Sequence, residues 1–258
     1  MSQTIIVPTA KPLGRKSYGS IGHLPNSRLG TGDHHVHEGQ AKICTVEARS
    51  KWDLIIVQEK LDGSNVGVAK VDGEILALNR AGYLAETSPF VQHHYFAKWV
   101  DQNKKRFDAL LKERERACGE WLMQAHGSRY RLWHEPFVLF DIFTPENQRL
   151  CFSHLNRRVY ESDSGFFQPF VVSVGPPISI EEALKNIPRN GNHGCEDELE
   201  GFIYRVENCQ DDTVDFLAKY VRPDKEDGKY LESVCGKVHW NTSLFGGYPF
   251  SELERLRQ

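Results

Sequence analysis

The sequence predicts an α+β fold built on antiparallel sheet, and two hairpins carry this prediction. In the first, Asp72-Gly73 separates two apolar runs, and an Asp-Gly pair suits a type I′ turn, which needs positive φ at both central positions. In the second, a polar turn joins the strands expected at 200–206 and 213–221. The expected helices lie apart from these hairpins, which favours helices flanking an antiparallel sheet over alternating βαβ units.

Two helices are expected from their end signals. Ser88-Pro89 opens the first, with Ser88 as N-cap and Pro89 at the first helical position, and apolar residues at helical spacing continue to about Leu111. Ser179 and Glu182 form a capping box that opens the second. Strands are expected at 54–59, 65–71, 74–79, 137–143, 200–206 and 213–221.

Residues 1–50 are rich in Gly, Pro, Ser and His and show little periodicity. We expect irregular structure there, with one short strand at 41–46. His35 and His37 would share one face of an extended segment, where both could reach one metal ion. The alternative is a polar surface loop that contains histidines.

The charges of the 258 residues nearly cancel: 32 Lys+Arg against 35 Asp+Glu give a formal net charge of −3. This excludes a protein that holds polyanions by bulk positive charge. If the partner is a nucleic acid or a nucleotide, the positive charge must therefore be focused locally. A hydrophobic content of 40% and a charged content of 26% are typical of globular protein.

The six cysteines are scattered and form no C-x-x-C pair, so a zinc site built from them is poorly supported. The first residues contain no apolar stretch long enough for a signal peptide, and no run of about 18 apolar residues could span a membrane. We therefore expect a cytoplasmic protein with free thiols.

The Lys60-Leu-Asp-Gly63 segment follows the strand expected at 54–59. A lysine with its ordinary pKa of about 10.4 is a poor nucleophile at neutral pH. Burial and nearby cations would lower that pKa, so a lysine at the end of a buried strand can act as an amine nucleophile. Gly63 permits a close backbone approach to a ligand. Taken alone, the K-x-D-G pattern is a weak signal.

Lys60 is the first residue of an ordered series of segments. The later members are Gly119-Glu120-Trp121, Phe140-Asp141, Glu200-Gly-Phe-Ile203 and Ala218-Lys-Tyr-Val-Arg222. This ordered set resembles the covalent nucleotidyltransferase superfamily, which comprises ATP-dependent ligases and mRNA capping enzymes. The resemblance covers residues 54–222 and implies an antiparallel-sheet adenylation domain with flanking helices.

Three further positions make the sequence most similar to the RNA ligase 2-like branch of that superfamily. Glu59 precedes the lysine, Asn65 follows it by five residues, and Arg80-Ala-Gly82 comes after the expected hairpin. The resemblance implies that Glu59, Asn65 and Arg80 contact the nucleotide or the phosphates of the strand end.

The resemblance also implies a three-step reaction. Lys60 would attack the α-phosphate of ATP, forming a lysyl-adenylate and releasing pyrophosphate. The AMP would pass to the 5′-phosphate of a nucleic acid strand, and a 3′-hydroxyl would then displace AMP and seal the ends. Phosphoryl transfer depends mostly on positioning and charge stabilisation, so cations must meet the phosphates.

Further roles follow from the same resemblance. Glu120 would bind the ribose hydroxyls, Phe140 would stack on adenine, and Glu200 would bind Mg²⁺ or Mn²⁺ directly or through water, since hard cations prefer oxygen ligands. All three could instead have structural roles. The remaining alternatives are Glu135 for the ribose and Phe137 or Phe143 for the adenine.

Lys219 and Arg222 are the expected phosphate-binding cations, but the last segment departs from the family pattern of two lysines separated by one residue. If Lys219 is the first lysine, the second position holds Val221; if it is the second, the first position holds Leu217. Strand alternation puts Lys219 and Val221 on one face, with Arg222 on the other unless the strand bends.

Length bounds the domain organisation. After Arg222, residues 223–258 are too few for an oligonucleotide-binding barrel. We therefore expect one nucleotidyltransferase domain at 51–258, with residues 1–50 as an extension that is part of it or packed on it.

The resulting expectation is an ATP-dependent RNA ligase whose substrates are ATP and RNA ends, either free or in a nicked duplex. An end-processing or strand-clamping protein would be a natural partner. The alternatives are a minimal ATP-dependent DNA ligase and a non-catalytic module that binds nucleic acid ends. A capping guanylyltransferase is less favoured, because it would carry a C-terminal barrel.

Overall fold

The computed structural model describes residues 10–243, which form two compact units. Unit 1 holds the described residues up to Ser20 together with Ser64–Gly119 and Phe140–Phe166. Unit 2 holds Ile21–Gly63, Glu120–Leu139 and the described residues from Phe167 onward.

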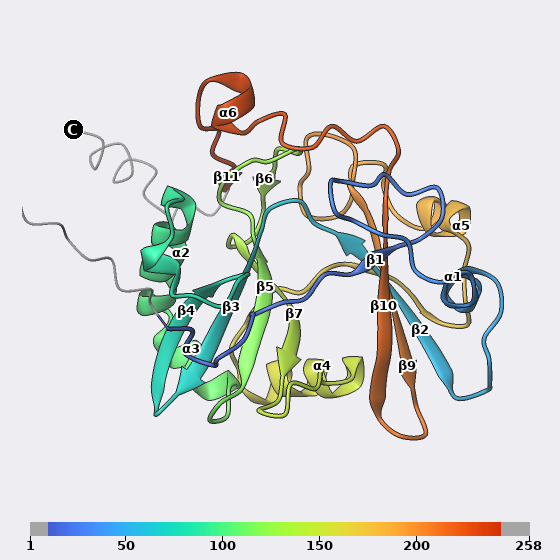
Figure 1. Ribbon diagram of the computed structural model, residues 1–258, viewed down its shortest axis with the longest axis horizontal. Coiled ribbons are helices and arrows are strands. Elements are labelled where there is room, and N and C mark those ends of the chain that lie inside the picture. Colours follow the sequence, from blue (N-terminus) through green and yellow to red (C-terminus); the bar gives the residue numbers. More distant parts are fainter. Residues whose placement is uncertain (1–9, 244–258) are drawn as a thin grey trace, which may run out of the picture. The chain divides into compact units, whose positions relative to one another are not determined.

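Unit 2 contains a five-stranded sheet (Figure 1). In spatial order its strands are β1 (Gly22–His23), β10 (Thr213–Val221), β9 (Gly201–Asn208), β2 (Asp53–Lys60) and β8 (Val171–Gly175). All neighbours pair antiparallel except β1, which lies parallel to β10. The predicted antiparallel architecture is therefore confirmed, and the strands expected at 54–59, 200–206 and 213–221 are all present.

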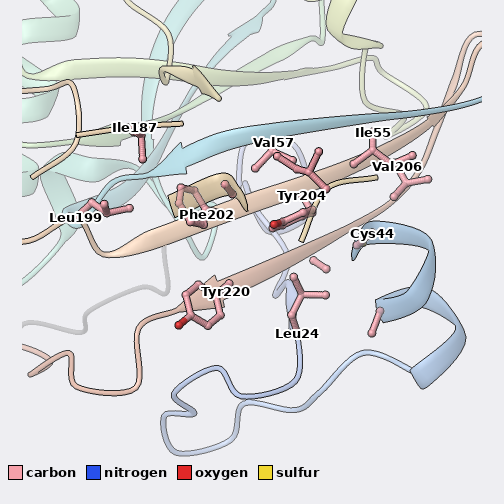
Figure 2. Close-up of a cluster of buried hydrophobic side chains, with 14 residues drawn as sticks. Leu24, Cys44, Ile55, Val57, Ile187, Leu199, Phe202, Tyr204, Val206 and Tyr220 are labelled. Atoms are coloured by element: carbon pink, nitrogen blue, oxygen red, sulfur yellow. The ribbon is translucent and has the colours of Figure 1, made fainter. Parts of the chain in front are cut away.

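The two faces of this sheet differ in chemistry. Residues paired directly across antiparallel strands point to the same face, so the row Val57–Tyr204–Ala218 and its neighbours two residues away share one face. That face carries the main apolar core of unit 2 (Figure 2). Its labelled members are Leu24, Cys44, Ile55, Val57, Ile187, Leu199, Phe202, Tyr204, Val206 and Tyr220.

The opposite face of the same sheet is polar near the strand ends. Gln58 of β2 pairs with Ile203, and Ile203 pairs with Lys219, so these three residues share a face. Lys60 lies two residues beyond Gln58 and therefore points the same way.

Three helices belong to unit 2: α1 (Glu38–Thr45), α5 (Ile180–Lys185) and α6 (Glu232–Cys235). The strand expected at 41–46 was wrong, because α1 occupies that stretch. His37 caps the helix: its ring accepts a hydrogen bond from Gly39 N, and the side chain of Gln40 accepts one from His37 N. Histidine is not a usual N-cap residue, so the sequence carried no ordinary signal for this start.

Unit 1 is built around a four-stranded sheet with the order β4-β3-β5-β7 (Figure 1). Its strands are β3 (Ser64–Val71), β4 (Glu74–Asn79), β5 (Arg116–Trp121) and β7 (Phe137–Phe143). Residues Glu120–Leu139, which include the end of β5 and the start of β7, belong to unit 2. A separate two-stranded sheet pairs β6 (Arg131–Leu132) with β11 (Thr242–Ser243).

The predicted hairpin in unit 1 is confirmed. Strands β3 and β4 pair antiparallel, and the turn residues Asp72 and Gly73 have φ of 52° and 78°. Positive φ at both positions is the geometry that an Asp-Gly turn favours. Both strand ranges lie within one residue of the expected ones.

The helices of unit 1 are η1 (Ala85–Thr87), α2 (Val91–Gln102), α3 (Lys104–Leu110) and α4 (Phe152–Glu161). The single helix expected from Ser88 is instead the pair α2 and α3, divided at Asn103, whose side chain bonds the carbonyl of Trp99. Ser88 is not the N-cap: its hydroxyl accepts a hydrogen bond from Phe90 N, Phe90 is the N-cap, and α2 begins at Val91, two residues later than expected.

Among residues 10–243, no helix is both long and apolar enough to cross a membrane.

Candidate functional site

Lys60 is the last residue of β2, and Glu200 immediately precedes β9. The register that pairs Lys60 with Gly201 brings the two side chains together. Lys60 Nζ lies 2.5 Å from Glu200 Oε2, and the exposed fractions of the two side chains are 21% and 8%. Two residues separated by 140 positions thus form a largely buried ion pair.

The charge state of Lys60 differs from the expectation of a lowered pKa. Burial does lower the pKa of the ammonium, but the carboxylates of Glu200 and Glu120 outweigh it, and the net pKa is raised. An opposite charge close by favours the charged form of a group. In this state Lys60 is an ammonium, and it must give up a proton before it can attack an electrophile.

Glu120 belongs to the same charge cluster. Its Oε1 accepts a hydrogen bond of 3.0 Å from Gly63 N, which ties β5 to the K-x-D-G loop. Burial raises the pKa of Glu120 to about 8, although Lys60 acts in the opposite direction. A Cβ on Gly63 would lie 2.6 Å from the carbonyl oxygen of Trp121, so glycine is required for this close approach.

A second buried ion pair, which the sequence analysis missed, holds Asp62. Its Oδ2 accepts hydrogen bonds from Lys225 Nζ and, at 2.9 Å, from Gly127 N. Lys225 Nζ also donates to Ser128 Oγ at 2.6 Å, and its side chain is only 3% exposed. Burial acts to raise the pKa of Asp62, but Lys225 outweighs it and the pKa is lowered. Lys225 and Asp62 are 163 positions apart in the chain, so no local sequence pattern marks this lysine.

Lys219 lies on the polar face of the sheet with Lys60. Its Nζ is 3.6 Å from Asp33 Oδ1, and its side chain is 18% exposed. Gln58 lies on the same face, two residues before Lys60 on β2 and in the same cross-strand row as Lys219; it is buried, and its Nε2 has no hydrogen-bond partner within the described residues. A buried amide without a partner is uncommon in folded proteins, and it marks this face as one that can receive a polar ligand.

Arg222 does not join this group. It follows β10, and its guanidinium donates to Leu199 O at 2.6 Å, to Glu198 at 2.7 Å and to Asp224 at 2.8 Å. These contacts hold the side chain against neighbouring backbone and carboxylates. From the sequence, Arg222 was predicted to bind phosphates, and that role stays a prediction.

Glu59 points to the other face of β2 from Lys60, because adjacent strand residues alternate. Its partner across the sheet is Phe202 of the apolar core, and its Oε2 accepts a hydrogen bond of 2.9 Å from Asn192 N. The loop at Gly191 packs so closely that a Cβ there would collide with the carboxylate. The structure therefore places the Glu59 and Lys60 side chains on opposite faces of β2, although both were expected in one site.

The Glu59 carboxyl is expected to make stability depend on pH. Burial raises the pKa of Glu59 to about 7 from an ordinary 4.5, so the folded state holds this proton more tightly than the unfolded chain. Stability from this group is present below pH 4.5 and is lost as the pH rises to about 7, by about 3 kcal/mol at most. Glu59→Gln should remove this loss, so urea unfolding at pH 5 and pH 8 should show the variant gaining relative to wild type at pH 8.

The control for this prediction is Glu196→Gln, which alters an exposed carboxylate paired with Arg129. Its stability should follow wild type at both pH values. An unchanged difference between Glu59→Gln and wild type across the range would contradict the assignment.

The remaining predicted residues lie in unit 1. Asn65 Oδ1 is buried and has no hydrogen-bond partner within the described residues. Arg80 is exposed, with one guanidinium nitrogen 3.4 Å from Gly19 O. Both are therefore open to further polar contacts.

Phe140 is the half-buried aromatic of β7, whereas Phe137 and Phe143 are 0% and 4% exposed. Tyr18 meets the Phe140 ring edge to face, with the ring centroids 5.1 Å apart. Of the three candidates for stacking on a base, Phe140 is the one with accessible surface.

No cluster of three or more His, Cys, Asp or Glu side chains poised to hold a metal ion occurs in the described part of the chain. The carboxylate set around Lys60 offers a different arrangement. Mg²⁺ is commonly bound by one or two carboxylates together with substrate phosphates and water, and Glu200 fits that pattern. His37, a candidate metal ligand from the sequence, is engaged as a helix cap.

Comparison with known proteins defines the class. The sequence model of the RNA ligase family matches residues 53–221, which is well over half of the chain. The chain therefore belongs to the RNA ligase family. A stretch of 32 residues is also 47% identical to an uncharacterized protein of Methanocaldococcus jannaschii, covering 12% of this chain and 8% of that protein.

Solved structures agree on the fold. The chain is similar to the RNA ligase of Naegleria gruberi in an apo aspartate-to-alanine variant, with a TM-score of 0.51 and 16% identity over 84% of this chain and 61% of that one. A lysine-to-alanine variant with ATP and Mn gives a TM-score of 0.50 and 19% identity over 78% and 58%. The chain thus spans about three-fifths of the length of those ligases, and the likeness shows the nucleotidyltransferase fold.

Proposed function

We propose that the chain is an ATP-dependent RNA ligase that joins 3′-OH and 5′-phosphate ends through a lysyl-AMP intermediate on Lys60. The observation that carries the proposal is the placement of Lys60 at the end of β2, paired with Glu200, in a chain of the RNA ligase family. A buried lysine can serve as a covalent nucleophile once it has lost its proton.

In the first step, Lys60 Nζ forms a bond to the α-phosphorus of ATP, the bond to the bridging oxygen breaks, and pyrophosphate leaves. Lys60 must shed a proton for this attack. Glu120, with a pKa of about 8, and Glu200 are the carboxylates near enough to influence that proton. Lys60 cannot attack while it is an ammonium paired with carboxylates. We therefore expect that, for adenylation, the ion pair between Glu200 and Lys60 breaks and Glu200 pairs with another cation.

In the second and third steps, a 5′-phosphate oxygen displaces Lys60 from the AMP phosphorus, and a 3′-hydroxyl then displaces AMP. Lys219 serves as a phosphate-binding cation, and Gln58 supplies an amide donor on the same face. In unit 1, Asn65, Arg80 and Phe140 serve the nucleotide or the strand end.

ATP and a divalent cation are the proposed ligands, and the Naegleria ligase structure that holds ATP and Mn supports this choice. Glu200 would hold the metal, with Glu120 and Asp62 nearby as further negative charge. When bound, the metal would neutralise phosphate charge.

The first test incubates the chain with α-labelled ATP and Mg²⁺ or Mn²⁺ and then separates it on a denaturing gel. We expect covalent label that is absent without a divalent metal and that is released by pyrophosphate. Absence of label with every nucleotide and metal would remove the enzyme proposal, and label from GTP alone would indicate a capping-type enzyme.

The second test compares sealing of nicked duplexes and single strands that carry RNA or DNA at the 3′-OH side. We expect faster sealing where the 3′-OH end is RNA. Equal sealing of an all-DNA nick would replace the RNA preference with a minimal DNA ligase.

A further inference from the structure

Residues 22–28, which precede β2 in the chain, pair with the edge of β10 near Lys219, the lysine proposed to bind phosphate. Strand β1 pairs in parallel with β10, and His23 lies opposite Lys219. Leu24 N donates to Lys219 O at 2.8 Å, and Arg28 N donates to Val221 O at 2.9 Å. The backbone of this segment therefore fixes the end of β10 that carries Lys219.

A chain of side chains runs along the same edge. Val221 N donates to Ser27 Oγ at 2.8 Å, and Ser27 Oγ lies 2.7 Å from His23 Nδ1. Since the Ser27 hydroxyl can donate to Nδ1, the neutral His23 ring would keep its hydrogen on Nε2. That nitrogen lies 2.9 Å from Asp33 Oδ2, while Asp33 Oδ1 lies 3.6 Å from Lys219 Nζ.

Asp33 is held firmly enough to orient a flexible partner. Its Oδ2 lies 2.9 Å from His23 Nε2 and accepts a hydrogen bond of 3.1 Å from Gly30 N, so the loop that carries Asp33 orients its carboxylate. Lysine has a long side chain whose immobilisation costs conformational entropy. A fixed carboxylate at ion-pair distance holds the lysine side chain in place before the ligand binds, so that less conformational entropy is lost on binding.

We propose that Asp33 is a positioning residue for Lys219, so that residues 21–37 form part of the phosphate-binding edge. This inference rests on the proposed function, in which Lys219 meets the phosphates of ATP. His23 acts one step further back, because it braces Asp33 from a buried site (1% exposed). The segment that looked irregular in sequence thereby gains a role in ligand binding.

Asp33→Asn tests the proposal, because it removes the charge and nearly keeps the shape. The measurement is the dissociation constant for ATP by titration calorimetry of the full chain, with the ATP concentration for half-maximal labelling as a second reading. We expect both to rise about 3- to 10-fold, the range for losing one ion pair and one pre-ordered side chain. Asp33→Glu, which keeps the charge, should recover part of the loss.

The matched control is Asp215→Asn, which removes an ion pair of 2.6 Å with Arg49 elsewhere on β10. It should bind ATP like wild type and should show a melting temperature similar to that of Asp33→Asn. Unchanged ATP binding in Asp33→Asn would overturn the proposal. Tighter binding would also overturn it, because it would show that Asp33 competes with the phosphates for Lys219. If wild type itself neither binds nor is labelled by ATP, the proposed function fails instead.

Discussion

Lys60→Arg is expected to abolish lysyl-AMP formation and leave the fold intact. Arginine keeps a positive charge for the buried Glu200, so the ion pair need not be broken. A guanidinium is not deprotonated in proteins, so it cannot act as the nucleophile. We expect the rate of covalent labelling to fall at least about 10⁴-fold, as when an enzyme loses its nucleophile.

The readout is gel labelling with α-labelled ATP beside the thermal unfolding curve of the same sample. Lys185→Arg is the matched control, since Lys185 is an exposed lysine paired with Glu181 at 2.8 Å. The control should label like wild type. Persistent label on a folded Lys60→Arg chain would show that another residue carries the nucleotide, and the site would have to be reassigned.

Lys225→Met is expected to lower the free energy of unfolding by about 3–5 kcal/mol, the usual cost of leaving one partner of a buried ion pair alone. Methionine fills a similar volume, but it removes the ammonium, so that Asp62 Oδ2 keeps the hydrogen bond from Gly127 N and loses the cation. A carboxylate so deeply placed is costly without a cation. Urea unfolding at pH 7 measures the loss.

Two companion variants separate charge from packing. Lys185→Met breaks an exposed pair and should cost at most about 1 kcal/mol. Adding Asp62→Asn to Lys225→Met removes the uncompensated charge and should restore part of the stability. If Lys225→Met destabilises no more than Lys185→Met, the buried pair does not hold the K-x-D-G loop.

The local elements could be predicted because their signals lie within a few residues. Asp72-Gly73 sets its own turn, and the apolar run 137–143 matches β7. Where the local signal was missing or misleading, prediction failed. His37 gave no ordinary capping signal for α1, and Asn103 divides a helix that apolar spacing alone had joined.

The candidate site was also predicted only in part. The residue types and their order along the chain pointed to Lys60, Glu120, Glu200 and Lys219 as one set, and to the family that the comparisons show. They could not show which face each side chain takes. Glu59 is next to Lys60 in sequence, yet strand alternation sends it into the apolar side of the sheet.

By itself, the sequence determined the antiparallel α+β class and the family, because period, turn residues and ordered motifs are properties of short segments; it also predicts Lys60 as the nucleophile. Only the tertiary structure decided the charge environment. The pairs Lys60–Glu200, Asp62–Lys225 and Asp33–Lys219 join residues more than a hundred positions apart. The strength of these ion pairs depends on burial and on strand register, and neither can be predicted from a short stretch of sequence.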